Sequence, residues 1–174
     1  MNPKIQLFIE DHLWEIDKNL FAALYEVLYA DLDSTGLDIC DFTEALLAAD
    51  INPEDYMDNI PPDYLYKSEN VEKVDIREGT QKIQNSAFFG CSNLKKICLP
   101  HSLKDIESQA FWDCNNIEEL IIMNPSIYIQ DDAFSGFYPI DNIHYNGTKD
   151  AYINSDFPFV GKHVYCTDGE LENE

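Results

Sequence analysis

Residues 94–117 read LKKICLPHSLKDIESQAFWDCNNI, and the apolar positions of this stretch recur every 23 residues on both sides of it. Leu94, for example, lies 23 residues from Val71 and 23 residues from Ile117. Six apolar columns repeat at this spacing, and chance does not align so many at one period. Their first members are Val71, Val74, Ile76, Ile83, Ala87 and Phe88. An internal repeat therefore governs the fold.

A period of roughly 20–29 residues with an L-x-x-L-x-L core is typical of a leucine-rich solenoid, in which each repeat buries its apolar face against the next. Within each repeat a three-residue burst alternates inward and outward side chains, as a short strand does. The bursts are Val74-Asp75-Ile76, Ile97-Cys98-Leu99, Leu120-Ile121-Ile122 and Ile143-His144-Tyr145. Such strands stack in parallel, about 4.8 Å apart. Their middle residues form a predicted outward column of Asp75, Cys98, Ile121 and His144.

The repeat unit closely resembles the BspA-type leucine-rich repeat, which runs strand, Pro-x-Ser-Leu-x-x-Ile, then Ala-Phe-x-x-Cys-x-x-Leu. Residues 99–106 read LPHSLKDI, residues 110–117 read AFWDCNNI and residues 87–94 read AFFGCSNL. The third unit departs from the pattern, with Asn124-Pro125 in place of Leu-Pro and Phe137 in place of the cysteine. The resemblance covers about residues 68–170 and implies a solenoid. For secreted members of the family it also implies a surface or adhesion role.

Residues 1–66 have a different pattern, which predicts helices. Two apolar stripes at helical spacing lie in residues 5–16 and 20–28, and Ile60-Pro61-Pro62 breaks the helical pattern. The expected fold class is therefore α+β, with a helical region that caps a short solenoid containing a stacked parallel sheet. The expected domains are residues 1–66 as the acidic helical cap, 67–147 as the solenoid, and 148–174 as the C-terminal cap and acidic tail.

The net charge of −22 is the second large signal in the sequence. Residues 1–66 hold 15 acidic side chains against Lys4 and Lys18, a net charge of −13. Residues 67–174 hold 18 acidic against 9 basic side chains, a net charge of −9. Such a field repels nucleic acid and anionic membranes and attracts basic surfaces. The expected partner is therefore a protein with a basic surface, with no direct nucleic acid or membrane contact.

The cysteine count and the hydropathy pattern predict a cytoplasmic protein. Five cysteines are an odd number with no C-x-x-C pair, which favours reduced thiols. Acidic side chains interrupt every apolar run near the N-terminus, so no signal peptide is expected, and no run reaches the length of a membrane span. The oligomeric state is left open.

Candidate chemical motifs are weak, and the chain is expected to be non-enzymatic, without cofactor or metal. Residues 31–36 begin like a calcium-binding EF-hand loop, but Phe42 stands where the loop needs a bidentate glutamate. Cys91 and Cys114 share one column and are expected to be core thiols rather than a metal pair or a disulfide. No sequence motif links a nucleophile to a base, so a hydrolase or metal enzyme is the least supported class.

Two functional hypotheses follow from the charge and the repeat. The first is an acidic intracellular inhibitor that occupies the basic nucleic-acid site of a nuclease or another DNA- or RNA-binding protein, by analogy with phage-type anti-restriction and anti-CRISPR proteins. The alternative is a leucine-rich-repeat surface, adhesion or scaffold protein that binds a partner through the solenoid face. The predicted partner-binding residues are Glu10, Asp11, Glu15, Asp17, Asp31, Asp33, Asp38, Asp41, Asp75, Ile121 and His144.

Overall fold

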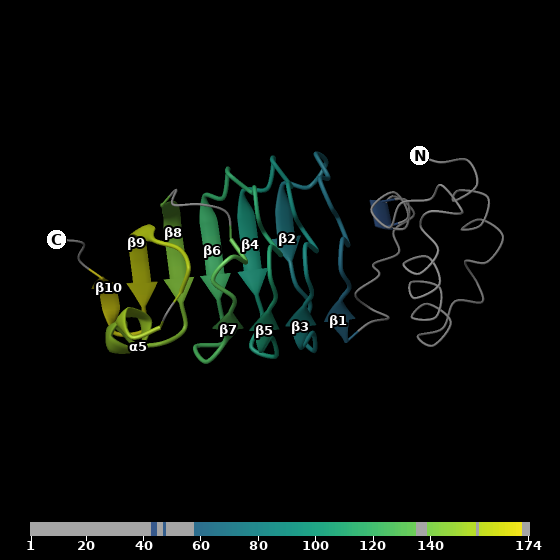
Figure 1. The fold of residues 1–174 in the computed structure, drawn as a ribbon. Helices are drawn as coiled ribbons and strands as arrows, with labels where there is room; N and C mark the ends of the chain where they lie inside the picture. The colour runs from purple at the N-terminus through teal and green to yellow at the C-terminus, as the bar shows by residue number, and fades with distance from the viewer. Residues whose placement is uncertain (1–42, 45–46, 48–57, 135–138, 156, 172–174) are drawn as a thin grey trace, which may run out of the picture.

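A computed structural model describes residues 43–44, 47, 58–134, 139–155 and 157–171. The described chain winds into a β-solenoid of about four turns, whose strands form two rows along one axis (Figure 1). The first row is a four-stranded parallel sheet in the order β1-β3-β5-β7. Its strands are β1 (Asn59–Ile60), β3 (Lys82–Ile83), β5 (Asp105–Ile106) and β7 (Tyr128–Ile129).

The second row is a six-stranded sheet in the order β10-β9-β8-β6-β4-β2. All of its neighbouring strands are parallel except the last pair, in which β10 runs antiparallel to β9. Its strands are β2 (Lys73–Asp75), β4 (Lys96–Leu99), β6 (Glu119–Ile122), β8 (Ile140–Tyr145), β9 (Gly161–Cys166) and β10 (Gly169–Leu171). A short helix, α5 (Lys149–Ile153), lies between β8 and β9, with Thr148 as its N-cap.

The strand register confirms the predicted solenoid. Val74 pairs with Ile97, and Ile97 with Leu120, so that each turn advances by one full sequence repeat. The other sheet has the same period, since Ile83 pairs with Ile106 and Ile106 with Ile129. A constant repeat length places equivalent side chains directly above one another, and this is why the sequence shows columns.

The core is built from these columns. The rings of Phe88, Phe111 and Phe134 stack with successive centroid distances of 5.0 Å, close to the spacing between turns. Tyr64 meets Phe88 edge-on at 5.8 Å, and Phe159 meets Phe134 edge-on at 4.9 Å. Phe157, which lies 23 residues after Phe134, stacks on Phe159 at 5.3 Å, so aromatic packing continues beyond the regular row.

Two recurring left-handed corners shape the turn between the sheets. All of the non-glycine residues with positive φ among the described residues, together with Gly90, fall into two columns that follow the sequence repeat, namely Asp63, Ser86 and Gln109, and then Lys67, Gly90 and Asp113. At Gly90 a Cβ atom would lie 2.9 Å from Cγ of Lys67, so a glycine gives that side chain room to pass. Five of the six positions lack glycine, and stacking between turns holds them in a conformation that L-residues avoid in isolation.

In the described part of the N-terminal end of the solenoid, one carboxylate bonds the first turn. In later turns, polar donors bond carbonyl groups of the preceding turn: Cys91 Sγ bonds Leu65 O at 3.1 Å, and Asn93 Nδ2 bonds Glu69 O at 2.8 Å. The first members of the same columns are Ser68 and Asn70, which have no repeat before them. Ser68 Oγ donates to Glu44 Oε1, and Asn70 Nδ2 donates to Glu44 Oε2 at 3.2 Å. Glu44 therefore supplies the acceptors that a preceding turn would otherwise provide.

The helical N-terminal region stays a prediction. Thr43, Glu44 and Leu47 have helical backbone, and the rest of residues 1–57 lies outside the described residues. The domain boundary near residue 66 also stays a prediction, although strand pairing in the solenoid already begins at Asn59. Among the described residues, no helix is both long enough and apolar enough to cross a membrane.

Glu44→Ala is expected to lower the free energy of unfolding by about 1–3 kcal/mol, because it leaves the buried Ser68 hydroxyl without its acceptor. Urea denaturation followed by circular dichroism measures the change. Glu69→Ala removes the same charge from an exposed position and is the matched control. Equal stability of the two variants would show that Glu44 does not close the solenoid.

Thr80→Val is expected to raise the stability by about 1 kcal/mol. Thr80 is fully buried, its hydroxyl has no hydrogen-bond partner among the described residues, and Leu103 occupies the equivalent core position one repeat later. Thr80→Ser keeps the hydroxyl and deletes a buried methyl group, so it should destabilise by a similar amount. A loss of melting temperature in Thr80→Val would mean that the hydroxyl is bonded.

Candidate functional site

The outer surface of the six-stranded sheet is the most regular exposed surface of the described chain. It carries two columns of outward side chains, which the strand register brings into line. We call these ten residues, together with Glu170 on β10, the strand face. The columns are Lys73, Lys96, Glu119, Asn142 and His163, and then Asp75, Cys98, Ile121, His144 and Tyr165.

The predicted outward column is in register in the structure. Asp75 and His144 are exposed at its two ends, and Cys98 and Ile121 are half-buried between them. Three of the predicted partner-binding residues, Asp75, Ile121 and His144, therefore share one surface. The other eight, all in residues 1–41, lie outside the described residues.

Ion pairs neutralise the N-terminal half of the strand face. Lys73 pairs with Asp75, and Lys96 Nζ lies 2.5 Å from Glu119 Oε2. The hydrogen bond to Glu119 raises the pKa of Lys96. All four side chains are about a third or more exposed, so solvent screens these pairs strongly. They keep this half of the face polar without giving it a net charge.

The centre of the strand face is apolar and chemically inert. Burial, followed by the negative charge of Asp75, raises the pKa of the Cys98 thiol above its usual range. The thiolate is the nucleophilic form of cysteine, so this shift disfavours a reactive Cys98. Ile121 lies next to it on β6 and adds a half-buried aliphatic side chain.

Aromatic rings cluster on the C-terminal half of the strand face. The His144 and Tyr165 rings stack with centroids 4.9 Å apart and an interplanar angle of 19°. The His163 ring is parallel to that of Tyr165 at 6.4 Å. Each imidazole also meets a carboxylate: His144 Nε2 lies 3.6 Å from Glu119 Oε1, and His163 Nδ1 lies 3.0 Å from Glu170 Oε1.

Sequence reasoning missed His163, Tyr165 and Glu170 because the repeat shortens at this point. His144 pairs with Tyr165, which comes before a full period is complete, so the regular columns do not extend to β9. A burst with Val164 inward and Tyr165 outward is the only sequence signal for the added strand. It resembles the four earlier bursts but falls out of step with them.

The other sheet also carries an ion-pair cluster. Lys82 Nζ lies 2.9 Å from Glu107 Oε1 and 3.0 Å from Asp105 Oδ2. These two hydrogen bonds raise the pKa of Lys82 to about 12. Tyr128, on the last strand of that sheet, is 64% exposed and lies away from the strand face.

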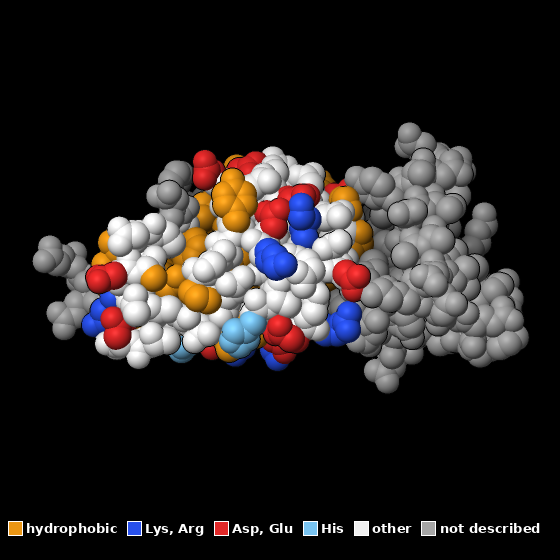
Figure 2. Space-filling view, turned by 90° about the horizontal axis from the view of Figure 1, so that it is seen from below, with side chains coloured by type: hydrophobic (Ala, Val, Ile, Leu, Met, Phe, Trp, Pro, Cys, Tyr) orange, Lys and Arg blue, Asp and Glu red, His pale blue; other side chains and the backbone are white. Residues whose placement is uncertain are grey.

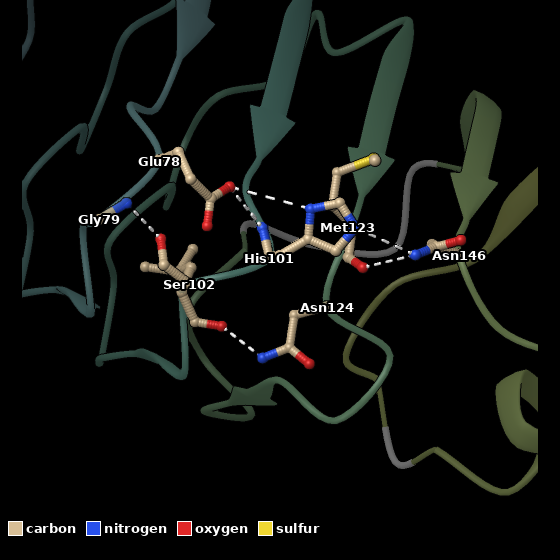
Figure 3. A network of polar contacts seen from close by, with 8 residues as sticks. Glu78, Gly79, His101, Ser102, Met123, Asn124 and Asn146 are labelled. Atoms are coloured by element: carbon tan, nitrogen blue, oxygen red, sulfur yellow. Dashed lines mark hydrogen bonds and ion pairs between the residues drawn. The ribbon is translucent and has the colours of Figure 1, made fainter.

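Polar contacts among Glu78, His101, Met123 and Asn146 join successive repeats (Figure 3), and we call this line of residues the turn edge. His101 is central to them: its backbone N–H donates to Glu78 Oε2 at 3.2 Å, and its Nε2 lies 3.3 Å from Asn146 Nδ2. Asn146 Nδ2 also donates to Met123 O at 3.0 Å. Because these groups bond to one another, the edge has a structural role.

In the view from below, acidic and basic side chains are interspersed over the described surface (Figure 2).

The cysteines and acids of the described residues form no metal site. Cys91 and Cys114 are buried free thiols, and each donates to a backbone carbonyl at 3.1 Å. Contact with Cys114 and burial raise the pKa of Cys91. Within the described ranges, no group of three or more His, Cys, Asp or Glu side chains could hold a metal ion. The loop at residues 31–42 that resembles an EF-hand lies outside those ranges.

Comparison with known proteins identifies the repeat. A family profile described as "BspA type Leucine rich repeat region (6 copies)" matches residues 58–158, more than half of the chain. No curated protein and no solved structure matches the chain. The match agrees with the repeating strand register and with the stacked sheets. The chain therefore belongs to the BspA-type leucine-rich repeat family, whose solenoids act as protein-binding modules.

Proposed function

We propose that this protein is a non-enzymatic module that binds a protein partner through its strand face. The observation that carries the proposal is the cluster of Tyr165, His144 and His163, which lies on the surface beside half-buried Ile121. Tyrosine is enriched at protein interfaces, where its ring supplies contact area and its hydroxyl supplies a hydrogen bond. The ion pairs around Lys73 and Lys96 suit the polar rim of such an interface.

The size of the strand face limits what it can bind alone. Six strands about 4.8 Å apart, with about four residues each, give a face of roughly 24 by 13 Å. The resulting area, roughly 300 Å², is less than half of the about 800 Å² that each partner buries in a standard interface. A stable partner must therefore also contact further surfaces of the protein.

The net charge of −22 favours a partner with a basic surface. The narrower hypothesis, an inhibitor that mimics nucleic acid, rests on this charge alone, and its residues in the N-terminal region lie outside the described residues. The family match favours the alternative, a repeat protein that acts as a scaffold or adhesion module. We also propose that the protein works in a reducing compartment. The four free cysteines among the described residues support this.

A photo-crosslinking amino acid at position 121 is expected to capture a partner from whole-cell extract, and the same group at position 128 is not. Position 121 lies on the strand face, whereas Tyr128 is exposed on the other sheet. With the crosslinker at position 121, Tyr165→Asp should weaken capture at least tenfold, as expected for a residue in an interface core, while Tyr128→Asp leaves it unchanged. Adducts are identified by mass spectrometry. Equal capture from both positions, or capture from position 128 alone, would refute binding through the strand face.

Salt dependence separates the two kinds of partner contact. Capture through position 121 should persist at about 0.5 M NaCl, where the Debye length is only a few ångströms. Capture that disappears at this concentration would favour the acidic inhibitor instead.

A further inference from the structure

The C-terminal corner of the strand face combines an aromatic ring with an available carboxylate. His144, Tyr165 and Glu170 lie side by side on β8, β9 and β10, because the register pairs each with the next. His144 covers one face of the Tyr165 ring at 4.9 Å. On the side of Tyr165 away from His144 lies β10, the last strand of the sheet, where Glu170 is the directly paired residue. Tyr165 remains 36% exposed.

The Glu170 carboxylate has capacity for a second hydrogen bond. Its Oε1 lies 3.0 Å from His163 Nδ1, and the Glu170 side chain is 48% exposed. Among the described residues, no partner is found for its second oxygen. The contact between His163 and Oε1 holds the carboxylate in place. Its second oxygen can then accept a hydrogen bond from a further donor beside the Tyr165 ring.

Charge around this corner favours a cation. The nearest lysine on β9 is Lys162, and its Nζ bonds Asp141 Oδ1 at 2.5 Å rather than Glu170. Lys96 is held by Glu119 at 2.5 Å on the other side of His144. An incoming cation would therefore meet two lysines on the strand face that are each paired with a carboxylate, and the net charge of −22 attracts it from a distance. The other lysine near this end of the sheet is Lys149, whose Nζ lies 3.4 Å from where a Cβ atom of Gly169 would be.

We propose that this corner, formed by His144, His163, Tyr165 and Glu170, seats an arginine side chain from a basic segment of the protein partner. The guanidinium plane stacks on Tyr165 in a cation–π contact while one of its N–H groups donates to Glu170. Arginine suits the corner better than lysine, because a planar guanidinium stacks and donates at the same time whereas an ammonium is a point charge. The inference rests on the proposed use of the strand face and specifies the chemistry of the partner.

The test uses the full-length protein and a short synthetic peptide, Gly-Ser-Arg-Gly-Ser-Arg-Gly with blocked ends, in 0.15 M NaCl. Two matched peptides replace arginine by lysine or by citrulline, the neutral isostere of arginine. Nuclear magnetic resonance titration follows the ring protons of His144 and His163 and the amides of residues 169–171. The arginine peptide should shift these signals selectively, the lysine peptide should bind several-fold more weakly, and the citrulline peptide should not bind.

Variants separate stacking from general attraction by the acidic chain. Tyr165→Leu should weaken arginine-peptide binding about fivefold or more, whereas Tyr165→Phe keeps the ring and should retain it. Glu170→Gln should also weaken binding, and Tyr128→Leu, away from the corner, should not. If Tyr165→Leu impairs folding, the comparison of the arginine and lysine peptides, which carry the same charge, on the unaltered protein still decides the question.

Three results would overturn the proposal: equal binding by Tyr165→Leu and the unaltered protein, equal affinity for the lysine and arginine peptides, or shifts spread evenly over the acidic surface. If any of these occurs while position 121 still captures a partner, the arginine site is wrong and the strand-face function stands. Loss of capture at position 121 would reject the proposed function itself.

Discussion

Every feature of this molecule depends on the hydrogen bonding of one turn to the next at a fixed strand spacing. From β1 to β7 in one sheet and from β2 to β8 in the other, each strand pairs with the strand one repeat later, so the backbone groups of one turn are satisfied by the next. Because this ladder repeats without a shift in register, side chains that lie one repeat apart share one environment. The phenylalanine row, the buried thiols and the strand face all follow from that constraint.

The same constraint decides what could be predicted. The inward columns and the outward column of Asp75, Cys98, Ile121 and His144 were predictable, because each needs only the period and the two-residue alternation of a strand. The left-handed corners at Ser86 and Gln109 were not, since neither residue favours positive φ and only the stacked neighbours impose it. Likewise, Glu44 was not recognised as an end closure, because no repeat links it to Ser68 and Asn70.

The candidate site was only half predictable for a related reason. His144 was found as the last member of a regular column. Its partners Tyr165 and Glu170 were not, because the final repeat is shorter and the last strand reverses direction. The groups that distinguish this solenoid from a uniform stack thus lie where the period ends. The turn edge around His101 shows the opposite case, in which regular columns yield mutual polar contacts and little chemistry for a partner.

The two ends of the solenoid are closed by unlike means, and this gives the molecule a mechanical polarity. At the C-terminal end a strand reverses and pairs antiparallel with its neighbour, so several backbone hydrogen bonds must break together before that end opens. In the described part of the N-terminal end, the side chain of Glu44 bonds Ser68 and Asn70. Because each turn contacts only its neighbours, a force along the axis should detach turns one after another from an end. If detachment starts at the C-terminal end, the pair of β9 and β10, which carries Tyr165 and Glu170, must open before any regular turn does.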